Sequence, residues 1–306
     1  MKKLFVLVVC LTIMGIQSIN AQAAIAMLHH EGNVNMYSSA QTAIDNSVDG
    51  DTIYLSEGLF GEFTINKGIA VIGSGIKTVV GPNIYIGDTG SESVNNVTVS
   101  NLSIIGKIEF LEEAVTNNVK IRQCKTAGDC NFVGTATNVE IALCHIQGSI
   151  CPNPNSTDIL TVINSKIGAV RYGGKDYGSV NFVNCNIGGI ENYDVQVRNN
   201  YINCYIGTTG LGNYKNCLYS NGSGGFLSDC FYYGDYLLDD NLNSKWTDDQ
   251  LSSAGYLGTD GTVVGITGGA VPFTLASPVL RITDHNIEVD NEQRKLKVTL
   301  TLGTEE

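Results

Sequence analysis

The sequence predicts an all-β protein: a right-handed single-stranded parallel β-helix (solenoid) with a short N-terminal capping helix and a C-terminal β-hairpin. A short pattern repeats about every 20 residues. The composition is rich in glycine and poor in charge, with 35 Gly and 16% charged residues, and long runs of good helix formers are nearly absent. We expect a signal peptide at 1–23, an N-terminal cap at 24–51, the β-helix at 52–235, an irregular closing segment at 236–277 and a hairpin cap at 278–306.

The first 23 residues have the features of a secretory signal peptide. Lys2 and Lys3 give a positive start, residues 4–16 an apolar stretch, and Ala21 and Ala23 small residues for cleavage. An uncleaved N-terminal anchor is the alternative. No second apolar run of membrane length follows, so we expect no transmembrane segment in the mature chain. The expected location is outside the cytoplasm of a bacterium: secreted, periplasmic or on the outer surface.

The repeat is clearest in five segments that begin apolar-x-apolar. They start at positions 97, 119, 139, 160 and 180, so the steps are 22, 20, 21 and 20 residues. Because side chains alternate across a strand, the first and third residues face one side. A coil this short cannot bury its apolar face alone, and stacking the coils buries it. Looser copies follow at 195–202, around 216–217 and around 229–230.

Two positions of the repeat carry a characteristic residue type. Position five is usually an amide, which can hydrogen-bond to its neighbours when stacked at a bend. Position six is often cysteine, which indicates an interior stack of small, soft side chains. The position-five residues are Asn101, Gln123, Asn164, Asn184, Asn199, Asn216 and Asp229, and the cysteines are Cys124, Cys144, Cys185, Cys217 and Cys230.

The cysteines leave two alternatives open. Of the nine, eight follow the expected leader, and an even count in an exported chain favours disulfides. Stacked cysteines on adjacent parallel strands have poor disulfide geometry, however, so we expect most of them to be reduced and buried. Cys151, which the pattern points outward, and Cys204, which falls between copies, are the expected exceptions.

The N-terminal region adds a second pattern. A short amphipathic helix with a serine cap is predicted at 39–47. It is followed by three short motifs, Gly-Asp-Thr-Ile at 50–53, Gly-Leu-Phe at 58–60 and Lys-Gly-Ile-Ala-Val-Ile-Gly at 67–73. This series resembles the opening of pectate-lyase-like β-helix proteins, in which the helix covers one end of the solenoid. The segment 257–274 resembles the close of secreted bacterial β-helix proteins without assigned chemistry. The resemblance implies the fold and leaves the activity open.

The lyases among such proteins imply a Ca²⁺ site of Asp or Glu beside an Arg or Lys base. Here the second strand of the repeat gives Arg171, with Lys175, as candidates for the base and Glu191 as a candidate metal ligand. The alternative is a solvated sheet face with mixed charges. The Gly-His-Gly and Arg-x-Lys motifs of the hydrolases of this fold are absent from the sequence. The outward file along this strand reads Glu109, Asn131, Cys151, Arg171, Glu191.

An acidic, aromatic stretch near position 235 supplies the remaining candidates. Its tyrosines are candidates for stacking on sugar rings, and its aspartates for holding Ca²⁺. A surface loop without a ligand is the alternative. The tyrosines are Tyr232, Tyr233 and Tyr236, and the aspartates are Asp235, Asp239 and Asp240.

These observations favour an exported or cell-surface β-helix for binding or display, with a glycan as a candidate partner, and no catalytic set is visible. The alternatives are a polysaccharide lyase-like enzyme acting on an anionic glycan and a structural segment of a surface assembly. No cofactor is expected, apart from Ca²⁺ in the lyase case. The net charge of -12 disfavours nucleic acid as a partner.

Overall fold

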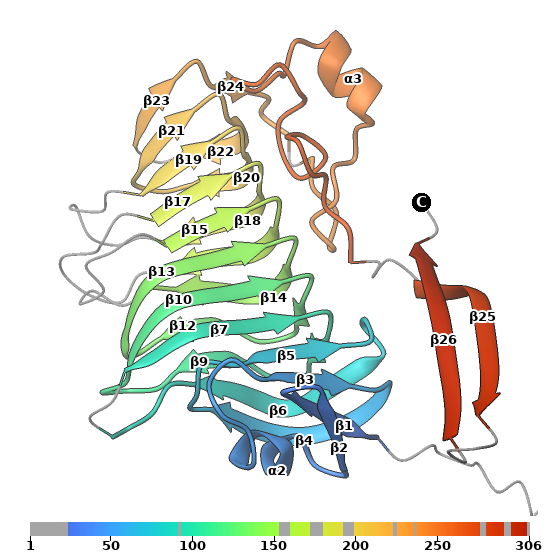
Figure 1. Cartoon of the computed structure of the whole chain (residues 1–306). Helices are drawn as coiled ribbons and strands as arrows, with labels where there is room; N and C mark the ends of the chain where they lie inside the picture. Colours follow the sequence, from blue (N-terminus) through green and yellow to red (C-terminus); the bar gives the residue numbers. More distant parts are fainter. Residues whose placement is uncertain are drawn as a thin grey trace, which may run out of the picture.

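The computed structural model describes residues 24–90, 93–152, 160–171, 180–191, 199–222, 225–235 and 237–275, and the backbone of two strands at 280–290 and 295–304. The chain winds into stacked coils that form two long sheets (Figure 1). From β3 onward, successive strands within each sheet pair in parallel, which confirms the predicted parallel β-helix. The predicted leader and Lys175 lie outside the described residues.

The first sheet, here called sheet A, carries the first strand of each repeat. Its order is β2-β1-β3-β5-β7-β10-β13-β15-β17-β19-β21-β23. The bounds are β1 Ala26–His30, β2 Asn33–Tyr37, β3 Thr52–Leu55, β5 Ala70–Gly73, β7 Val94–Ser100, β10 Val115–Arg122, β13 Thr135–Ala142, β15 Leu160–Ile163, β17 Val180–Val183, β19 Asn200–Ile202, β21 Asn213–Lys215 and β23 Phe226–Ser228.

The second sheet, sheet B, carries the strand that follows the turn in each repeat. Its order is β11-β8-β6-β9-β12-β14-β16-β18-β20-β22-β24, and β4 pairs with β6. The bounds are β4 Gly58–Ile65, β6 Thr78–Ile86, β8 Ser103–Ile104, β9 Ile108–Phe110, β11 Lys125–Thr126, β12 Cys130–Phe132, β14 His145–Cys151, β16 Lys166–Arg171, β18 Asn186–Glu191, β20 Tyr205–Thr209, β22 Leu218–Gly222 and β24 Phe231–Tyr232.

The turn between the two sheets explains the amide at position five. Asn164, Asn184 and Asn203 have φ of 44°, 52° and 55°, which is the left-handed region. Asparagine tolerates this region better than other residues with a side chain, because its short amide hydrogen-bonds locally. The predicted Asn preference is therefore confirmed, but its reason is backbone conformation at the corner as much as amide stacking. Gln123 and Leu143 adopt the same conformation in their coils.

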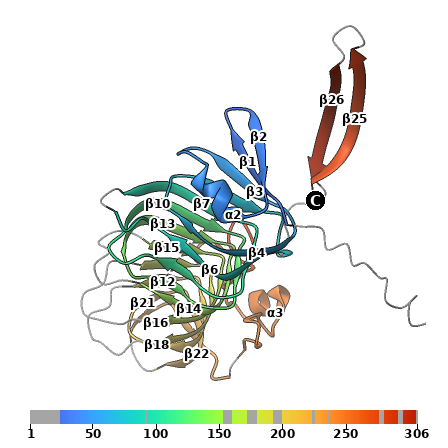
Figure 2. The ribbon, with the colours of Figure 1, turned by 90° about the horizontal axis from the view of Figure 1, so that it is seen from below.

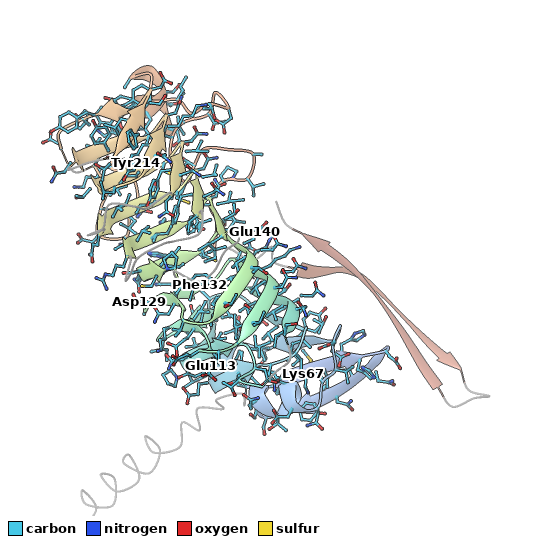
Figure 3. The ribbon with its side chains drawn as sticks, turned by 90° about the vertical axis from the view of Figure 1, so that its left-hand side faces the viewer. Lys67, Glu113, Asp129, Phe132, Glu140 and Tyr214 are labelled. Atoms are coloured by element: carbon cyan, nitrogen blue, oxygen red, sulfur yellow. The ribbon has the colours of Figure 1, made fainter. Side chains whose placement is uncertain are left out.

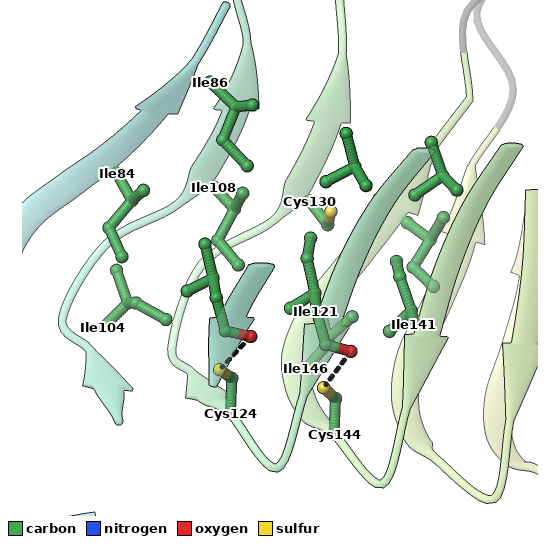
Figure 4. Close-up of a cluster of buried hydrophobic side chains, with 14 of the residues drawn as sticks. Ile84, Ile86, Ile104, Ile108, Ile121, Cys124, Cys130, Ile141, Cys144 and Ile146 are labelled. Carbon is green, nitrogen blue, oxygen red and sulfur yellow. Dashed lines mark hydrogen bonds between the residues drawn. The ribbon is translucent and has the colours of Figure 1, made fainter. Parts of the chain in front are cut away.

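The position-six cysteines form a buried file beside this corner. Each thiol donates to the carbonyl oxygen two residues before it, for example Cys144 Sγ to Ala142 O at 3.3 Å. Figure 4 shows Cys124 and Cys144 among interior isoleucines, each also directed at a carbonyl of the preceding coil. The eight described cysteines are all free thiols, six of them buried, as predicted.

The expectation for Cys204 was wrong. Its side chain is fully buried, because Asn203, and not Asn199, occupies the corner and Cys204 follows it in position six. The copy expected at 195–202 was therefore placed four residues too early. The corners at 203, 216 and 229 lie only 13 residues apart, so the last coils are shorter than those before them.

The interior of the later coils contains an aromatic stack. Phe182 lies 5.0 Å from Tyr201, and Tyr201 lies 4.8 Å from Tyr214, between ring centroids that are nearly parallel. All three side chains are buried, and the hydroxyl of Tyr214 donates to Gly210 O at 2.9 Å. Figure 3 shows Tyr214 in the last coils. The stack fills the interior where the coils shorten.

A helix and a hairpin cover the N-terminal end of the solenoid. Helix α2 (Ala40–Asp45) begins at Ser39, whose side chain accepts from Thr42 N, which confirms the predicted capping helix. Lys67 in the second coil donates to three carbonyls at the end of the helix, those of Ile44, Asp45 and Ser47. The antiparallel hairpin β1–β2, which the sequence did not predict, extends sheet A beyond β3 (Figure 2).

The closing segment, residues 237–275, packs on the outside of the coils. It contains helix α3 (Asp248–Ser253), with a capping box at Thr247. Its apolar residues form a second core with Tyr205 and Leu218, which point outward from sheet B. Two amides hold it in place: the corner residue Asn164 donates to Gly268 O at 2.7 Å, and Asn186 at the start of β18 donates to Leu242 O at 2.8 Å.

The last two strands, β25 (Leu280–Asp290) and β26 (Lys295–Thr304), form the predicted antiparallel hairpin. They make a two-stranded sheet of their own. That this hairpin caps the rod stays a prediction. In the part of the chain that the structure describes, no helix is long and apolar enough to cross a membrane.

Candidate functional site

The predicted charged file on sheet B is present, and its charges neutralise one another in pairs. Arg171 lies beside Glu191 in the register of β16 and β18, and its Nε donates to Glu191 Oε2 at 2.7 Å. The hydrogen bond from Glu191 raises the pKa of the Arg171 guanidinium. Both side chains are about half exposed, at 52% and 44%. Lys107 and Glu109 form a second such pair on this face.

The residues between these pairs are polar or weakly acidic. Asn131 and Cys151 lie next to each other in the register. Burial raises the pKa of the Cys151 thiol to about 11, so the thiol is protonated at neutral pH. Asp129 accepts a hydrogen bond from Ser149 N at 2.6 Å. The file therefore matches a solvated sheet face whose charges are paired. Arg171 is bound to Glu191, the carboxylate that the lyase hypothesis assigns to a metal.

The candidate aspartates lie in a loop and are not brought together. Asp239 accepts from Asn241 N, Asn243 N and Asn243 Nδ2 at 2.8–2.9 Å, and these bonds lower its pKa. Asp235 and Asp240 are exposed. Among the described residues, no group of three or more His, Cys, Asp or Glu is arranged to hold a metal ion. Asp239 thus organises the turn that starts the closing segment.

The candidate tyrosines have different surroundings. Tyr233 packs edge-on against Trp246, with ring centroids 4.9 Å apart, so it belongs to the core under the closing segment. Tyr232 is 63% exposed. It continues the inward-facing file of Ile206 and Tyr219 at the end of sheet B. Tyr236 lies outside the described residues.

Sheet A presents a different surface, which the sequence did not single out. Asn181, Asn200 and Asn213 are neighbours in the register and face outward from β17, β19 and β21. Asn200 Nδ2 donates to Asn181 Oδ1 at 2.9 Å, and Asn213 Nδ2 donates to Asn200 Oδ1 at 3.2 Å. We call these three residues the amide ladder. Because each amide holds the next, the ladder is fixed in position and orientation.

An apolar file runs parallel to the amide ladder on the same face. It consists of Ile163, Val183 and Ile202, which are partly buried, and it leads to Lys215. Phe226, 82% exposed, follows Asn213 at the end of the ladder. Ile202, Lys215 and Phe226, with Asn200 and Asn213 of the ladder, border a hollow of about 310 Å³ between β19, β21 and β23, which we call the sheet A hollow.

The chemistry of the sheet A hollow is that of a site for a neutral or weakly charged amphipathic ligand. Phe226 and Ile202 offer apolar surface, Asn213 offers both a donor and an acceptor, and Lys215 offers a cation. No side chain in it has the arrangement of a nucleophile with its base. A sequence signal existed: Asn181, Asn200 and Asn213 alternate with buried aromatic residues. The misplaced register of the coil that contains Asn200 concealed it.

Comparison with family models, with curated proteins and with solved structures finds no match to this chain.

Proposed function

We propose that the protein is an exported or cell-surface β-helix that binds a glycan, and that the outer face of sheet A around the sheet A hollow is its binding surface. The observation that carries the proposal is the amide ladder beside Phe226. Ring faces of sugars present C–H groups, which pack on apolar and aromatic side chains, while their hydroxyls pair with amides. A hollow that combines apolar walls with a few fixed polar groups suits such a ligand.

The geometry of the solenoid supports an elongated ligand over a single sugar. The outward residues repeat once per coil, so similar groups recur along the axis at strand spacing. The ladder continues past Asn181 to Thr161 and Glu140 in the register. A chain of sugars lying along the rod would meet an amide, the hydroxyl of Thr161 or the carboxylate of Glu140 at successive coils. The N-terminal pattern also supports placing the solenoid with the pectate-lyase-like β-helices, and the leader-like residues 1–23 support export.

Binding to a panel of immobilised glycans, followed by titration calorimetry with the best of them, tests this proposal. Asn213→Ala and Lys215→Ala are each expected to weaken binding, by about 5-fold for one lost hydrogen bond of about 1 kcal/mol. Lys77→Ala is the matched control, because Lys77 is an exposed lysine that precedes β6 of sheet B and is not part of the outer face of sheet A. Equal loss in all three variants, or no binding to any glycan, would contradict the proposal.

The same panel tests the lyase alternative. Anionic glycans are incubated with the protein and Ca²⁺, and the absorbance of an unsaturated product is recorded. A rising signal that Arg171→Ala abolishes would place catalysis on sheet B and replace the binding proposal. A flat trace with binding retained supports the binding proposal over the lyase alternative for the glycans tested.

A further inference from the structure

Among the described residues, the solenoid is covered at its N-terminal end and left open at the other. The interior files run on to the last coil, where their members become exposed. Leu227 pairs with the buried Tyr214 in the register, yet it is 49% exposed. Tyr232 is 63% exposed at the end of the file that starts with buried isoleucines, and Cys230 is partly exposed. The last coil thus presents interior side chains to solvent.

The backbone of β23 is also prepared for a further strand. Phe226 N donates to Gly212 O, and Ser228 O accepts from Asn216 N, so both residues direct their backbone groups at β21. Successive residues of a strand point their N–H and C=O groups to opposite sides. The N–H and C=O of Leu227 therefore point away from the sheet. Within the described residues, β23 is the last strand of sheet A.

The opposite end of sheet A has a matching edge. Its last strand is β2, in which Val34 is 55% and Met36 is 70% exposed. In the register with β1, Val34 and Met36 lie opposite His29 and Met27, while Asn35 and Tyr37 lie opposite the buried Leu28 and Ala26. Val34 and Met36 therefore face outward. Asn35 and Tyr37 lie on the inward side of the strand, where Tyr37 packs against the core and Asn35 is exposed.

The direction of β2 fits β23. Strand β2 is antiparallel to β1, and β1 is antiparallel to β3, so β2 runs parallel to β3 and to every later strand of sheet A. Placing β2 of one molecule beside β23 of another by a translation along the rod gives the parallel pairing that the rest of the sheet uses. Neither strand contains a charged residue or a proline, two of the features that protect exposed edges from pairing, although β23 is only three residues long.

We propose that the protein assembles head to tail, with β2 of one copy added to β23 of the next. Strands that pair in a sheet place outward side chains next to outward ones and inward next to inward ones. Phe226 would therefore lie beside Val34 or Met36 of the other copy, and Leu227 beside Asn35 or Tyr37. The contact joins two different surfaces of the same chain, so it is heterologous and leaves one free end of each kind. Assembly therefore continues into linear chains of solenoids. In such a chain, the interior side chains at the β23 end of each molecule are covered by the next molecule, except in the terminal copy.

Two complementary variants test this arrangement on the full-length protein. Met36→Lys places a charge on β2 and leaves β23 intact, while Leu227→Lys does the reverse and leaves Phe226 of the sheet A hollow unchanged. Both side chains are already exposed, and circular dichroism with thermal denaturation checks that the variants fold. Ile105→Lys, at a 57% exposed isoleucine between two strands of sheet B, is the control. Sizes are measured by sedimentation velocity over a range of protein concentrations.

The expected result has three parts. The unmodified protein and Ile105→Lys give a ladder of sizes that grows with concentration. Each end variant alone loses every species larger than the monomer. An equimolar mixture of the two end variants forms dimers and nothing larger, because only one pair of intact ends can meet. A monomeric unmodified protein overturns the proposal. Assemblies that persist in Met36→Lys also overturn it.

Discussion

Replacing Asn203 by alanine removes two separate contributions to the stability of the coil corner. The residue is 3% exposed and has φ of 55°. Its Oδ1 accepts hydrogen bonds from Thr259 N at 2.9 Å and from Thr259 Oγ1 at 3.3 Å, which tie the closing segment to the solenoid. Alanine loses the acceptor and also resists the left-handed conformation. Glycine loses the acceptor alone, because it has no Cβ to clash there.

The magnitudes follow from these two terms. A left-handed φ costs a non-glycine residue about 1–2 kcal/mol, and a lost hydrogen bond costs about 1 kcal/mol. Asn203→Ala should therefore lower the free energy of unfolding by about 2–3 kcal/mol, and Asn203→Gly by about 1 kcal/mol. The difference between the two variants isolates the backbone term.

Urea unfolding with two probes measures both effects. The single tryptophan, Trp246, lies in the closing segment, where it packs against Tyr233 and Tyr256, so its fluorescence reports release of that segment. Far-ultraviolet circular dichroism reports the sheets. Equal losses in the alanine and glycine variants would refute the role given to φ. An unchanged fluorescence transition in both would refute the role given to the amide.

Two further predictions concern the interior and the closing segment. Tyr201 is buried between Phe182 and Tyr214, and its replacement by alanine should lower the protein's free energy of unfolding by about 3–5 kcal/mol. Replacement by leucine should lower it by less. Equal melting temperatures for the two variants would contradict the stacking argument. Burial and the nearby Lys166 lower the pKa of His145 to about 4. Its neutral form is therefore favoured in the folded state, so stability is full above pH 6.5 and falls as the pH drops towards 4, by up to about 3 kcal/mol. Urea midpoints at pH 7 and pH 4 should differ less in His145→Gln than in the unmodified protein, and an equal difference would remove His145 as the cause.

The solenoid was predictable because its pattern is local and repeated. The apolar-x-apolar start of each coil sets the inward face, and five copies at nearly constant spacing set the register before any long-range contact is known. The capping helix was predictable for a similar reason, since Ser39 and the residues after it carry their own signal. Such elements depend on short segments of sequence, and the structure places them where those segments indicate.

The short coils were not predictable from that pattern. A search at a period near 20 residues finds the corners at 216 and 229 only as loose copies, and it assigned the corner at Asn203 to Asn199. Tyrosines fill the narrower interior of these coils and obscure the apolar-x-apolar pattern, because tyrosine occurs both on protein surfaces and in cores. For this reason the sequence did not predict the amide ladder, whose three residues align only in the correct register.

The candidate site itself depends on contacts between coils. Arg171 and Glu191 share an outward file in the sequence, and the register adds that they pair with each other. Tyr233 and Tyr232 are adjacent, yet one lies in the core under the closing segment and the other at the open end. The path of the closing segment decides between these surroundings, and nothing in the local sequence determines that path.

The buried file of cysteines provides one thiol in each of several coils along the solenoid axis. Six coils each carry one thiol at the same position, from Cys124 to Cys230. Burial raises the pKa of Cys124, Cys204 and Cys217 well above the usual range, so these thiols are poor nucleophiles while their coils are closed. In a solenoid each coil contacts only its neighbours, so opening can progress one coil at a time. Seven coils span this stretch, and the one with its corner at Asn164 carries Ser165 at this position. Pulses of an alkylating reagent, read out by peptide mass spectrometry, would therefore time the opening of the other six coils, and Cys230 at the exposed end would be labelled first.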